Sequence, residues 1–260
     1  MEPIRSTKVS SPYDLPWMTF DKLCGLVEDS FKNAVKKVKE PPEDRNDPTL
    51  VAAYAALTNT GVEETIYILR KATAVKTFQN AVGSLHQKIL GNVEGWKDSG
   101  TRGGGFDIRS VGPVARAQNR IVLMEIKMRW NTIKGSDEKI MHDKLLAAVK
   151  SNWGGEYDTV GYLAQIVPKN NESYDRPWKV SRREADEIVR AIDGKTAYHL
   201  VTGHPDALEQ VLSILPHAFN RVLTKKKIDH LDFSNDIDVR ILNESMKLAL
   251  PTSSAYVSGS

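Results

Sequence analysis

The segment Ile121-Val122-Leu123-Met124-Glu125-Ile126-Lys127 decides the fold, because an apolar run ends in two charged residues that flank one apolar residue. Such a run is typical of a buried strand. Side chains two positions apart in a strand share a face, so Glu125 and Lys127 point one way while Met124 and Ile126 pack on the other. The strand therefore brings a carboxylate and an ammonium group to the same side of a sheet.

The upstream segment Gly103-Gly104-Gly105-Phe106-Asp107-Ile108 places an Asp after a glycine-rich turn, eighteen positions before Glu125. If Asp107 comes from a neighbouring strand, two carboxylates and the Lys127 ammonium converge. Carboxylates bind hard divalent cations, a bound cation activates water and offsets phosphate charge, and a lysine orients the water or stabilises the same charge. This set favours phosphodiester hydrolysis. The alternative is a Glu–Lys pair at a strand end with Asp107 as a turn residue, and the spacing leaves both interpretations open.

The composition is that of an ordinary globular protein, since 40% of the 260 residues are hydrophobic and 27% are charged. The net charge of +3 is compatible with a polyanionic partner but does not require one. The single cysteine, Cys24, excludes an intrachain disulfide, and we expect it to be a core residue. No apolar stretch is long enough to span a bilayer, and the N-terminus lacks the apolar block of a signal peptide, so we expect a cytoplasmic protein without membrane contact.

The first third of the chain predicts helices. Apolar residues lie near one face over residues 19–38, and Pro41-Pro42 ends that helix. A second helical run begins at Pro48, a third follows Gly61 through Ala72, and a fourth covers residues 76–90. The N-terminal region is therefore expected to be mainly helical.

Beyond residue 105 the pattern alternates between strands and helices. We predict strands over residues 106–111, 121–127, 159–167 and 196–202, and helices over residues 137–149, 185–192 and 205–215. This order predicts an α/β fold with a central sheet flanked by helices. The polar tail after Lys225-Lys226-Lys227 is expected to wrap a subunit or to stay flexible.

Several motifs then follow one another in a fixed order with compact spacing. They are Ser84-Leu85-His86-Gln87-Lys88-Ile89-Leu90-Gly91, Gly95-Trp96, Gly104-Gly105-Phe106-Asp107, Glu125-Ile126-Lys127, Asn131-Thr132 and Lys134-Gly135-Ser136. This combination resembles a family of Type II restriction endonucleases of the PD-(D/E)xK superfamily, whose members cut the interrupted palindrome GG-N-CC. The resemblance covers residues 75–216, and Phe106 stands where the superfamily usually has a proline.

The resemblance implies a restriction-endonuclease-like core with a mixed sheet. It implies Asp107 and Glu125 as ligands of Mg²⁺, with Mn²⁺ as a substitute, and Lys127 as the catalytic lysine. The carbonyl of Ile126 lies between the two motif side chains and is expected to be a further ligand. The resemblance also implies a homodimer that cuts both strands of double-stranded DNA, with a cognate DNA methyltransferase as a functional rather than physical partner.

We divide the chain into a helical N-terminal region (1–74), a nuclease core (75–223) and a C-terminal tail (224–260), with one continuous domain as the alternative. Three residues are accessory candidates. Glu94 is a water-mediated metal ligand, a further acidic member of the site or, in the favoured interpretation, an exposed loop carboxylate. His86 and Gln87 are candidates for contacts to phosphate or water, and the alternative for His86 is a buried structural histidine.

DNA contacts are expected from the residues that follow the catalytic strand and from one arginine pair. The first group comprises Arg129, Asn131, Lys134 and Ser136, with Lys134 and Ser136 on phosphates. Arg182 and Arg183 are expected to begin a helix and to present guanidinium groups to the major groove. In both groups a solvated surface is the alternative. The competing functions are a repair or structure-specific nuclease and a non-catalytic DNA-binding protein.

Overall fold

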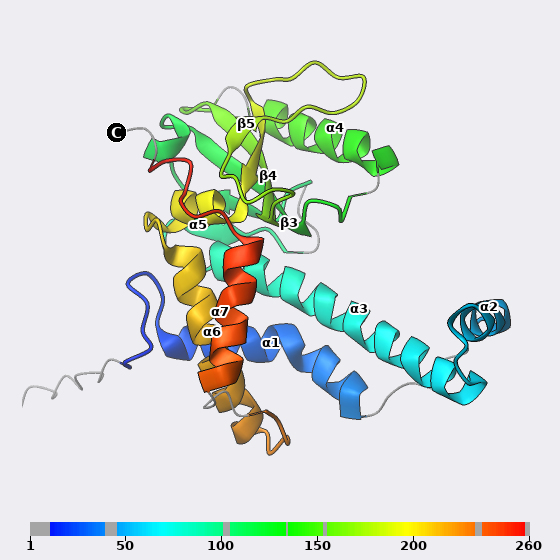
Figure 1. The fold of residues 1–260 in the computed structure, drawn as a ribbon. Helices are drawn as coiled ribbons and strands as arrows, with labels where there is room; N and C mark the ends of the chain where they lie inside the picture. The colour runs from blue at the N-terminus through cyan, green and yellow to red at the C-terminus, as the bar shows by residue number, and fades with distance from the viewer. Residues whose placement is uncertain are drawn as a thin grey trace, which may run out of the picture.

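A computed structural model describes residues 11–39, 46–100, 105–133, 135–152, 155–231 and 236–257 (Figure 1). Three helices come first: α1 (Phe20–Lys39), α2 (Pro48–Thr58) and α3 (Val62–Gly91). The remaining strands and helices begin with a β1–β2 hairpin and end in three consecutive helices. They are β1 (Trp96–Asp98), β2 (Ile108–Ser110), β3 (Ile121–Arg129), α4 (Gly135–Ser151), β4 (Thr159–Val167), β5 (Asp175–Pro177), β6 (Val189–Asp193), α5 (Gly194–Thr202), α6 (Ala207–Lys225) and α7 (Asp236–Ala249).

A six-stranded mixed sheet organises the second part of the chain, in the order β1-β2-β3-β4-β6-β5. Strands β1, β2 and β3 pair antiparallel, β3, β4 and β6 pair parallel, and β5 joins the edge antiparallel to β6. The parallel pair β3–β4 is joined through α4, as parallel strands require a crossover. The predicted fold class, an α/β sheet flanked by helices with a helical N-terminal region, is confirmed.

Strand β3 separates two hydrophobic clusters. Its residues Val122, Met124 and Ile126 belong to the larger cluster, which includes side chains of α1, α3, α5 and α6. Leu123 belongs to the smaller cluster, where it packs with Leu145 of α4. Because strand side chains alternate, Glu125 and Lys127 lie on the α4 side of the sheet. The burial of Cys24 in the larger cluster confirms it as a core residue.

Most helices and strands predicted for the first two thirds of the chain are present, but two predicted helices form one continuous helix. The runs predicted after Gly61 and over residues 76–90 form the single helix α3, which also passes through the proposed boundary at residue 74. Nothing else in the structure bears on the domain boundaries, which remain a prediction. Within the described ranges, no helix combines the length and the apolar character needed to cross a lipid bilayer.

Two predictions in the last third are wrong. Residues 185–192 were expected to be helical, but β6 occupies Val189–Asp193, where it is buried between β4 and β5. Residues 196–202 were expected to be a strand, but they belong to helix α5. The Asp193 side chain caps α5 by accepting a hydrogen bond from the Thr196 amide (3.0 Å), and Gly203 ends the helix at a φ of 81°. These caps outweigh the β-branched composition of the segment.

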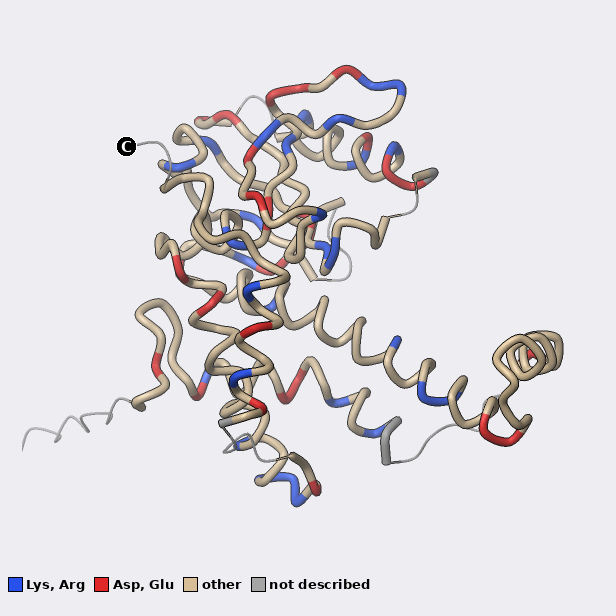
Figure 2. Tube along the Cα trace, in the orientation of Figure 1, with Lys and Arg blue, Asp and Glu red and all other residues tan. Residues whose placement is uncertain are grey.

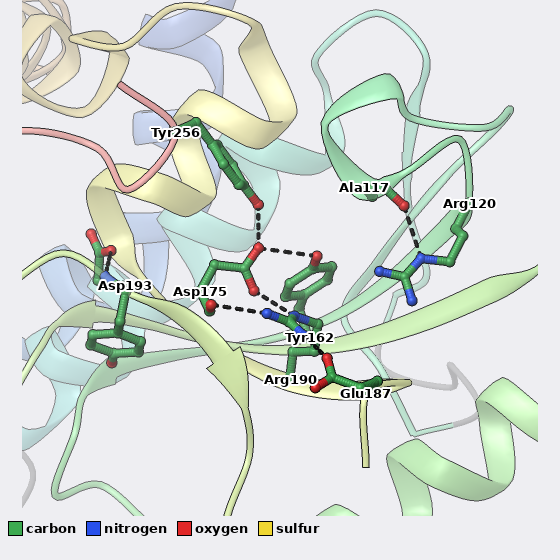
Figure 3. Close-up of polar contacts among 9 residues, drawn as sticks. Ala117, Arg120, Tyr162, Asp175, Glu187, Arg190, Asp193 and Tyr256 are labelled. Carbon is green, nitrogen blue, oxygen red and sulfur yellow. Dashed lines mark hydrogen bonds and ion pairs between the residues drawn. The ribbon is translucent and has the colours of Figure 1, made fainter. Parts of the chain in front are cut away.

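The tail also contains a helix that the sequence analysis did not predict. Helix α7 covers Asp236–Ala249, and the segment after it returns to the sheet. There the Tyr256 hydroxyl donates to the carboxylate of Asp175 at 2.7 Å (Figure 3). Arg190 pairs with the same carboxylate, its Nε lying 2.6 Å from Oδ1, and the Tyr162 hydroxyl donates at 3.4 Å. This network fastens the C-terminal segment to the edge strand β5 and its neighbours β6 and β4.

Candidate active site

The hairpin of β2 and β3 brings Asp107 beside Glu125. Ile108 of β2 lies opposite Met124 of β3, so the residue before β2 approaches the residue after Met124. The backbone holds Asp107 in place at both ends, since its amide donates to the Met124 carbonyl (2.9 Å) and its own carbonyl accepts from the Ser99 amide (2.8 Å). Asp107 therefore sits on ordered backbone rather than in a free turn.

The side chains of the predicted triad converge on the α4 side of the sheet. One oxygen of Asp107, Oδ2, accepts a hydrogen bond from the Ile126 amide at 2.7 Å. Lys127 Nζ lies 2.6 Å from Glu125 Oε1, and the two side chains are 26% and 14% exposed. The structure thus brings together the three residues that the sequence singled out. An isolated Glu–Lys pair, the alternative interpretation, does not account for the Asp107 carboxylate held beside it.

The electrostatics of this group are unfavourable to two ionised carboxylates. The pKa of Asp107 is raised from 3.8 to about 6, chiefly by burial and then by the negative charge of Glu125. The Ile126 amide and the Lys127 ammonium oppose that rise, and Asp98 adds to it. A buried carboxylate whose ionised form is disfavoured by a second carboxylate is a frequent sign of a functional site. A cation bound between the two would relieve the repulsion.

The donor set fits a hard cation better than a soft one. Across the described ranges, no group of three or more His, Cys, Asp or Glu side chains is placed to hold a metal ion. Asp107 and Glu125 can therefore offer two carboxylates, and water, a backbone carbonyl or a substrate oxygen would complete the shell. Mg²⁺ is usually bound in this way, through one or two carboxylates with several waters retained. A structural zinc site needs four protein ligands and does not fit.

The turn before the site depends on glycine. Gly105 has a φ of 97°, a backbone conformation that residues with a side chain rarely adopt. A Cβ at this position would also lie 3.4 Å from the carbonyl oxygen of Lys144 in α4. Gly105 therefore lets the chain pass close to α4 on its way into β2. Gly103 and Gly104, the other members of the predicted turn, lie outside the described residues.

Asp98 is a site residue that the sequence analysis missed. It is the last residue of β1 and pairs with Ile108, and its charge acts on Asp107. Its Oδ1 accepts from Gln87 Nε2 at 2.9 Å and from the Gly100 amide at 2.7 Å. Gln87, an accessory candidate, is thus tied through Asp98 to the edge of the site.

The other two accessory candidates occupy different environments. His86 is buried, its Nδ1 lies 2.7 Å from the Tyr198 hydroxyl, and burial lowers its pKa to about 4. We interpret it as a structural histidine. Glu94 is an exposed residue of the turn before β1, as the favoured interpretation expected. Trp96 in β1 is 8% exposed and packs in the larger cluster.

The residues expected to contact DNA after β3 are only partly described. Arg129 ends β3 and Asn131 lies in the following turn, and both are exposed. The ring of Trp130, between them, is 41% exposed and lies 5.3 Å from the Lys169 ammonium. Lys134 lies outside the described residues, and the side chain of Ser136 in α4 is not described.

The prediction that Arg182 and Arg183 begin a helix is wrong. Both lie in an exposed turn, where Arg182 has a φ of 62°. Arg183 is paired with Asp143 of α4, with Nε 2.9 Å from Oδ1 and Nη2 2.8 Å from Oδ2. This ion pair lowers the pKa of the Asp143 carboxyl. The Arg183 guanidinium is therefore engaged by α4 at the surface.

Comparison with known proteins identifies the family. Residues 18–224 match the model of the Eco47II restriction endonuclease family. The chain is 35% identical to the Type II restriction enzyme Eco47II of Escherichia coli over 157 residues, which cover 58% of this chain and 62% of that protein. It is 26% identical to the Type II restriction enzyme Sau96I of Staphylococcus aureus over 162 residues, covering 58% and 57%. The chain thus spans about three fifths of the length of these relatives. On the match to residues 18–224, the chain belongs to the Eco47II restriction endonuclease family.

Proposed function

We propose that the protein is a Type II restriction endonuclease that cuts double-stranded DNA at a short interrupted palindrome, GGNCC or a related site. The observation that carries the proposal is the convergence of Asp107, Glu125 and Lys127, with the lysine 2.6 Å from the glutamate and the pKa of the aspartate raised by its neighbours. Family membership and the names of the relatives support the same reaction.

The protein groups have separate roles in this proposal. Asp107 and Glu125 would hold a divalent cation, Mg²⁺ or Mn²⁺, with the Ile126 carbonyl as a further ligand. The bound cation supplies Lewis acidity that lowers the pKa of a water and offsets charge on the phosphate. The Lys127 ammonium orients the attacking water or stabilises the negative charge that develops on the phosphate oxygens. The hydrogen bond from the Lys127 ammonium to Glu125 Oε1 at 2.6 Å supports this role, because it keeps the ammonium beside the carboxylates.

The reaction is a hydrolysis. The water oxygen bonds to phosphorus, the bond from phosphorus to the 3′ oxygen breaks, and the products carry a 5′-phosphate and a 3′-hydroxyl. A palindrome presents the same scissile bond on both strands, so a symmetric homodimer would supply one site for each. Arg129 at the end of β3 and Asn131 in the turn after it, both exposed, would lie against the DNA with Lys134 and Ser136. We place the protein in the cytoplasm, with a cognate methyltransferase protecting the host DNA.

Digestion of a sequenced plasmid with Mg²⁺ tests the proposal. We expect discrete fragments whose sequenced ends fall in one palindromic site. Glu125→Gln should abolish the cuts, and Glu172→Gln, an exposed carboxylate on the β4–β5 loop, should keep them. Smeared products or cleavage at branched junctions would instead favour a repair or structure-specific nuclease. DNA retardation without any released ends would favour a non-catalytic binding protein.

A further inference from the structure

A row of side chains crosses the α4 face of the sheet, from β3 to the edge strand β5. Residues that pair across neighbouring strands lie on the same face of a sheet. Glu125 of β3 pairs with Leu163 of β4. Leu163 pairs in turn with Ala191 of β6, which pairs with Arg176 of β5. Arg176 therefore lies on the same face of the sheet as Glu125.

Gln165 and Tyr174 connect the same two strands a second time. Gln165 of β4 is the register partner of Lys127 of β3, so the two side chains are neighbours on this face. The Tyr174 hydroxyl, which comes just before β5, donates to Gln165 Oε1 at 2.5 Å. The Arg176 guanidinium carbon lies 4.8 Å from the centre of the Tyr174 ring. Lys127 is thus linked to Arg176 through two intermediate side chains.

A hollow of about 500 Å³ opens on this side of the sheet, and we term it the β5 pocket. Its volume is within the range of small-ligand sites. The residues that line it within the described ranges include no Asp or Glu. Those that matter for its chemistry are Gln165, Tyr174, Arg176, Trp178, Lys179 and Ala191. The β5 pocket therefore combines an amide, two aromatic rings and two cations without a carboxylate.

Arg176 and Lys179 are exposed, and neither has a carboxylate partner in the part of the chain that the structure describes. Other basic residues nearby are paired, since Arg190 bonds Asp175 (Figure 3) and Arg183 bonds the carboxylate of α4. Figure 2 shows the basic residues on the segment that follows β5. The two unpaired cations and the Gln165 amide make the β5 pocket suited to an anion.

The distance from Glu125 to the β5 pocket suits a DNA backbone. Three strand spacings of about 4.8 Å separate β3 from β5, so the backbones of Glu125 and Arg176 are about 14 Å apart. A DNA strand advances about 3.4 Å along its axis for each phosphate. A strand whose scissile phosphate lies at Glu125 and Lys127 therefore brings a few further phosphates within reach of the β5 pocket.

We propose that the β5 pocket binds the phosphodiester backbone of the DNA strand that enters the active site, with Arg176 and Lys179 each contacting a phosphate a few nucleotides from the scissile bond. Gln165, held by Tyr174, donates its amide to the same stretch of backbone. The inference rests on the proposed function, because the strand reaches the β5 pocket from the site at Glu125 and Lys127. It adds contacts at β5 to those expected after β3.

The salt dependence of DNA binding tests this proposal. Fluorescence anisotropy in EDTA, which prevents cleavage, measures the affinity for a duplex that carries the cleaved site at several salt concentrations. Each lost phosphate contact lowers the slope of log affinity against log salt by about 0.9. Arg176→Gln with Lys179→Gln should therefore lower the slope by about 2 and weaken binding on the order of a hundredfold. Arg176→Lys keeps the charge and should keep the slope.

The matched control removes the same charges elsewhere. Arg70 and Lys76 are exposed residues of α3, outside the sheet. Arg70→Gln with Lys76→Gln changes the net charge equally and should leave the slope within about 0.5 of wild type. Circular dichroism checks that both double variants keep the wild-type secondary structure.

Neutral phosphates locate the contact. Replacing single phosphates of the duplex by methylphosphonates should weaken binding by wild type at positions a few nucleotides from the scissile bond, and the double variant should not respond at those positions.

The results separate the β5 pocket from the proposed function. If wild type cuts DNA at one site while Arg176→Gln with Lys179→Gln keeps the wild-type slope, the pocket proposal alone is overturned. An equal loss of slope in the α3 control would overturn it as well. Thermal stabilisation of wild type by inorganic phosphate, with an unchanged DNA slope in the pocket variant, would assign the β5 pocket to a free anion and overturn the proposal. A wild type that neither binds nor cuts DNA would overturn the proposed function and the inference with it.

Discussion

Replacing Asp107 by Asn should make the metal-free protein more stable at pH 8 while removing its activity. The rise in the pKa of Asp107 from 3.8 to about 6 corresponds to about 3 kcal/mol, since each pKa unit is worth about 1.4 kcal/mol. Ionised Asp107 carries this cost in the folded state because it is buried beside Glu125. Asn has nearly the same shape, and its oxygen can still accept from the Ile126 amide.

The sign of the effect sets its pH dependence. The folded protein holds the Asp107 proton more tightly than the unfolded chain does, so wild-type stability falls as the pH rises from about 4 to about 6 and stays lower above that. The advantage of Asp107→Asn should therefore be about 3 kcal/mol at pH 8 and about half as large at pH 5.

Urea denaturation in EDTA measures this difference, with Glu172→Gln as the control for removing an exposed carboxylate. Adding Mg²⁺ should then stabilise the wild type and not Asp107→Asn, because a ligand stabilises only the protein that binds it. The reasoning is refuted if Asp107→Asn is no more stable than wild type at pH 8, or if its advantage does not shrink at pH 5.

Four further predictions concern other residues. Lys127→Met should reduce cleavage by at least about a hundredfold in single-turnover assays while DNA binding in gel shifts persists, because the ammonium acts on developing charge. Arg183→Ala should leave the cleaved sequence unchanged in a digest, since its guanidinium is held by Asp143 on the surface. Tyr198→Phe should cost about 1–2 kcal/mol in urea denaturation by removing the partner of buried His86. Burial lowers the pKa of His86 from 6.5 to about 4, so the unfolded chain takes up this proton at a higher pH than the folded protein does. Wild type should therefore lose about 3 kcal/mol of stability as the pH falls from 6.5 to 4, and His86→Gln should not show this loss. Urea denaturation of both proteins across this pH range measures the difference.

The sequence was sufficient to predict strand β3 and the two strands that flank it, β2 and β4. The alternation in β3 is strong because one strand separates two hydrophobic clusters, so the directions of Glu125 and Lys127 followed from position alone. The approach of Asp107 required a β2–β3 hairpin, which the glycine-rich turn and the second apolar run suggested. Helix α1 was equally clear, since its apolar residues keep helical spacing and are buried.

Asp98 could not be predicted because its place depends on contacts distant in the sequence. It reaches the site only because β1 pairs with β2 and packs tightly against the end of α3. A Cβ at Gly91 would lie 2.9 Å from Asp98, so the close approach needs glycine there. Neither fact is visible in the segment around residue 98, although the Gln87 side chain that bonds Asp98 was already a candidate.

The errors in β6 and α5 have a common physical cause. The two elements are adjacent, short and buried in their central parts. Neither has a solvent-facing polar side, so the spacing of apolar and polar residues cannot distinguish a helix from a strand there. The signals that would have separated them are the helix caps, Asp193 at the start of α5 and Gly203 at its end. Arg182 adopts a φ of 62°, and Arg183 pairs with Asp143 of α4; neither the left-handed backbone nor this distant partner is visible in the local sequence.

Cleavage by the three single variants tests the central claim most directly. We propose that Asp107, Glu125 and Lys127 form one cation-dependent site. Wild type with Mg²⁺ should release 5′-phosphate ends from a defined duplex, and EDTA, Asp107→Ala, Glu125→Ala or Lys127→Ala should each stop the release while the variants remain folded. Cleavage by wild type in EDTA, or undiminished cleavage by any of the three variants, would contradict the account.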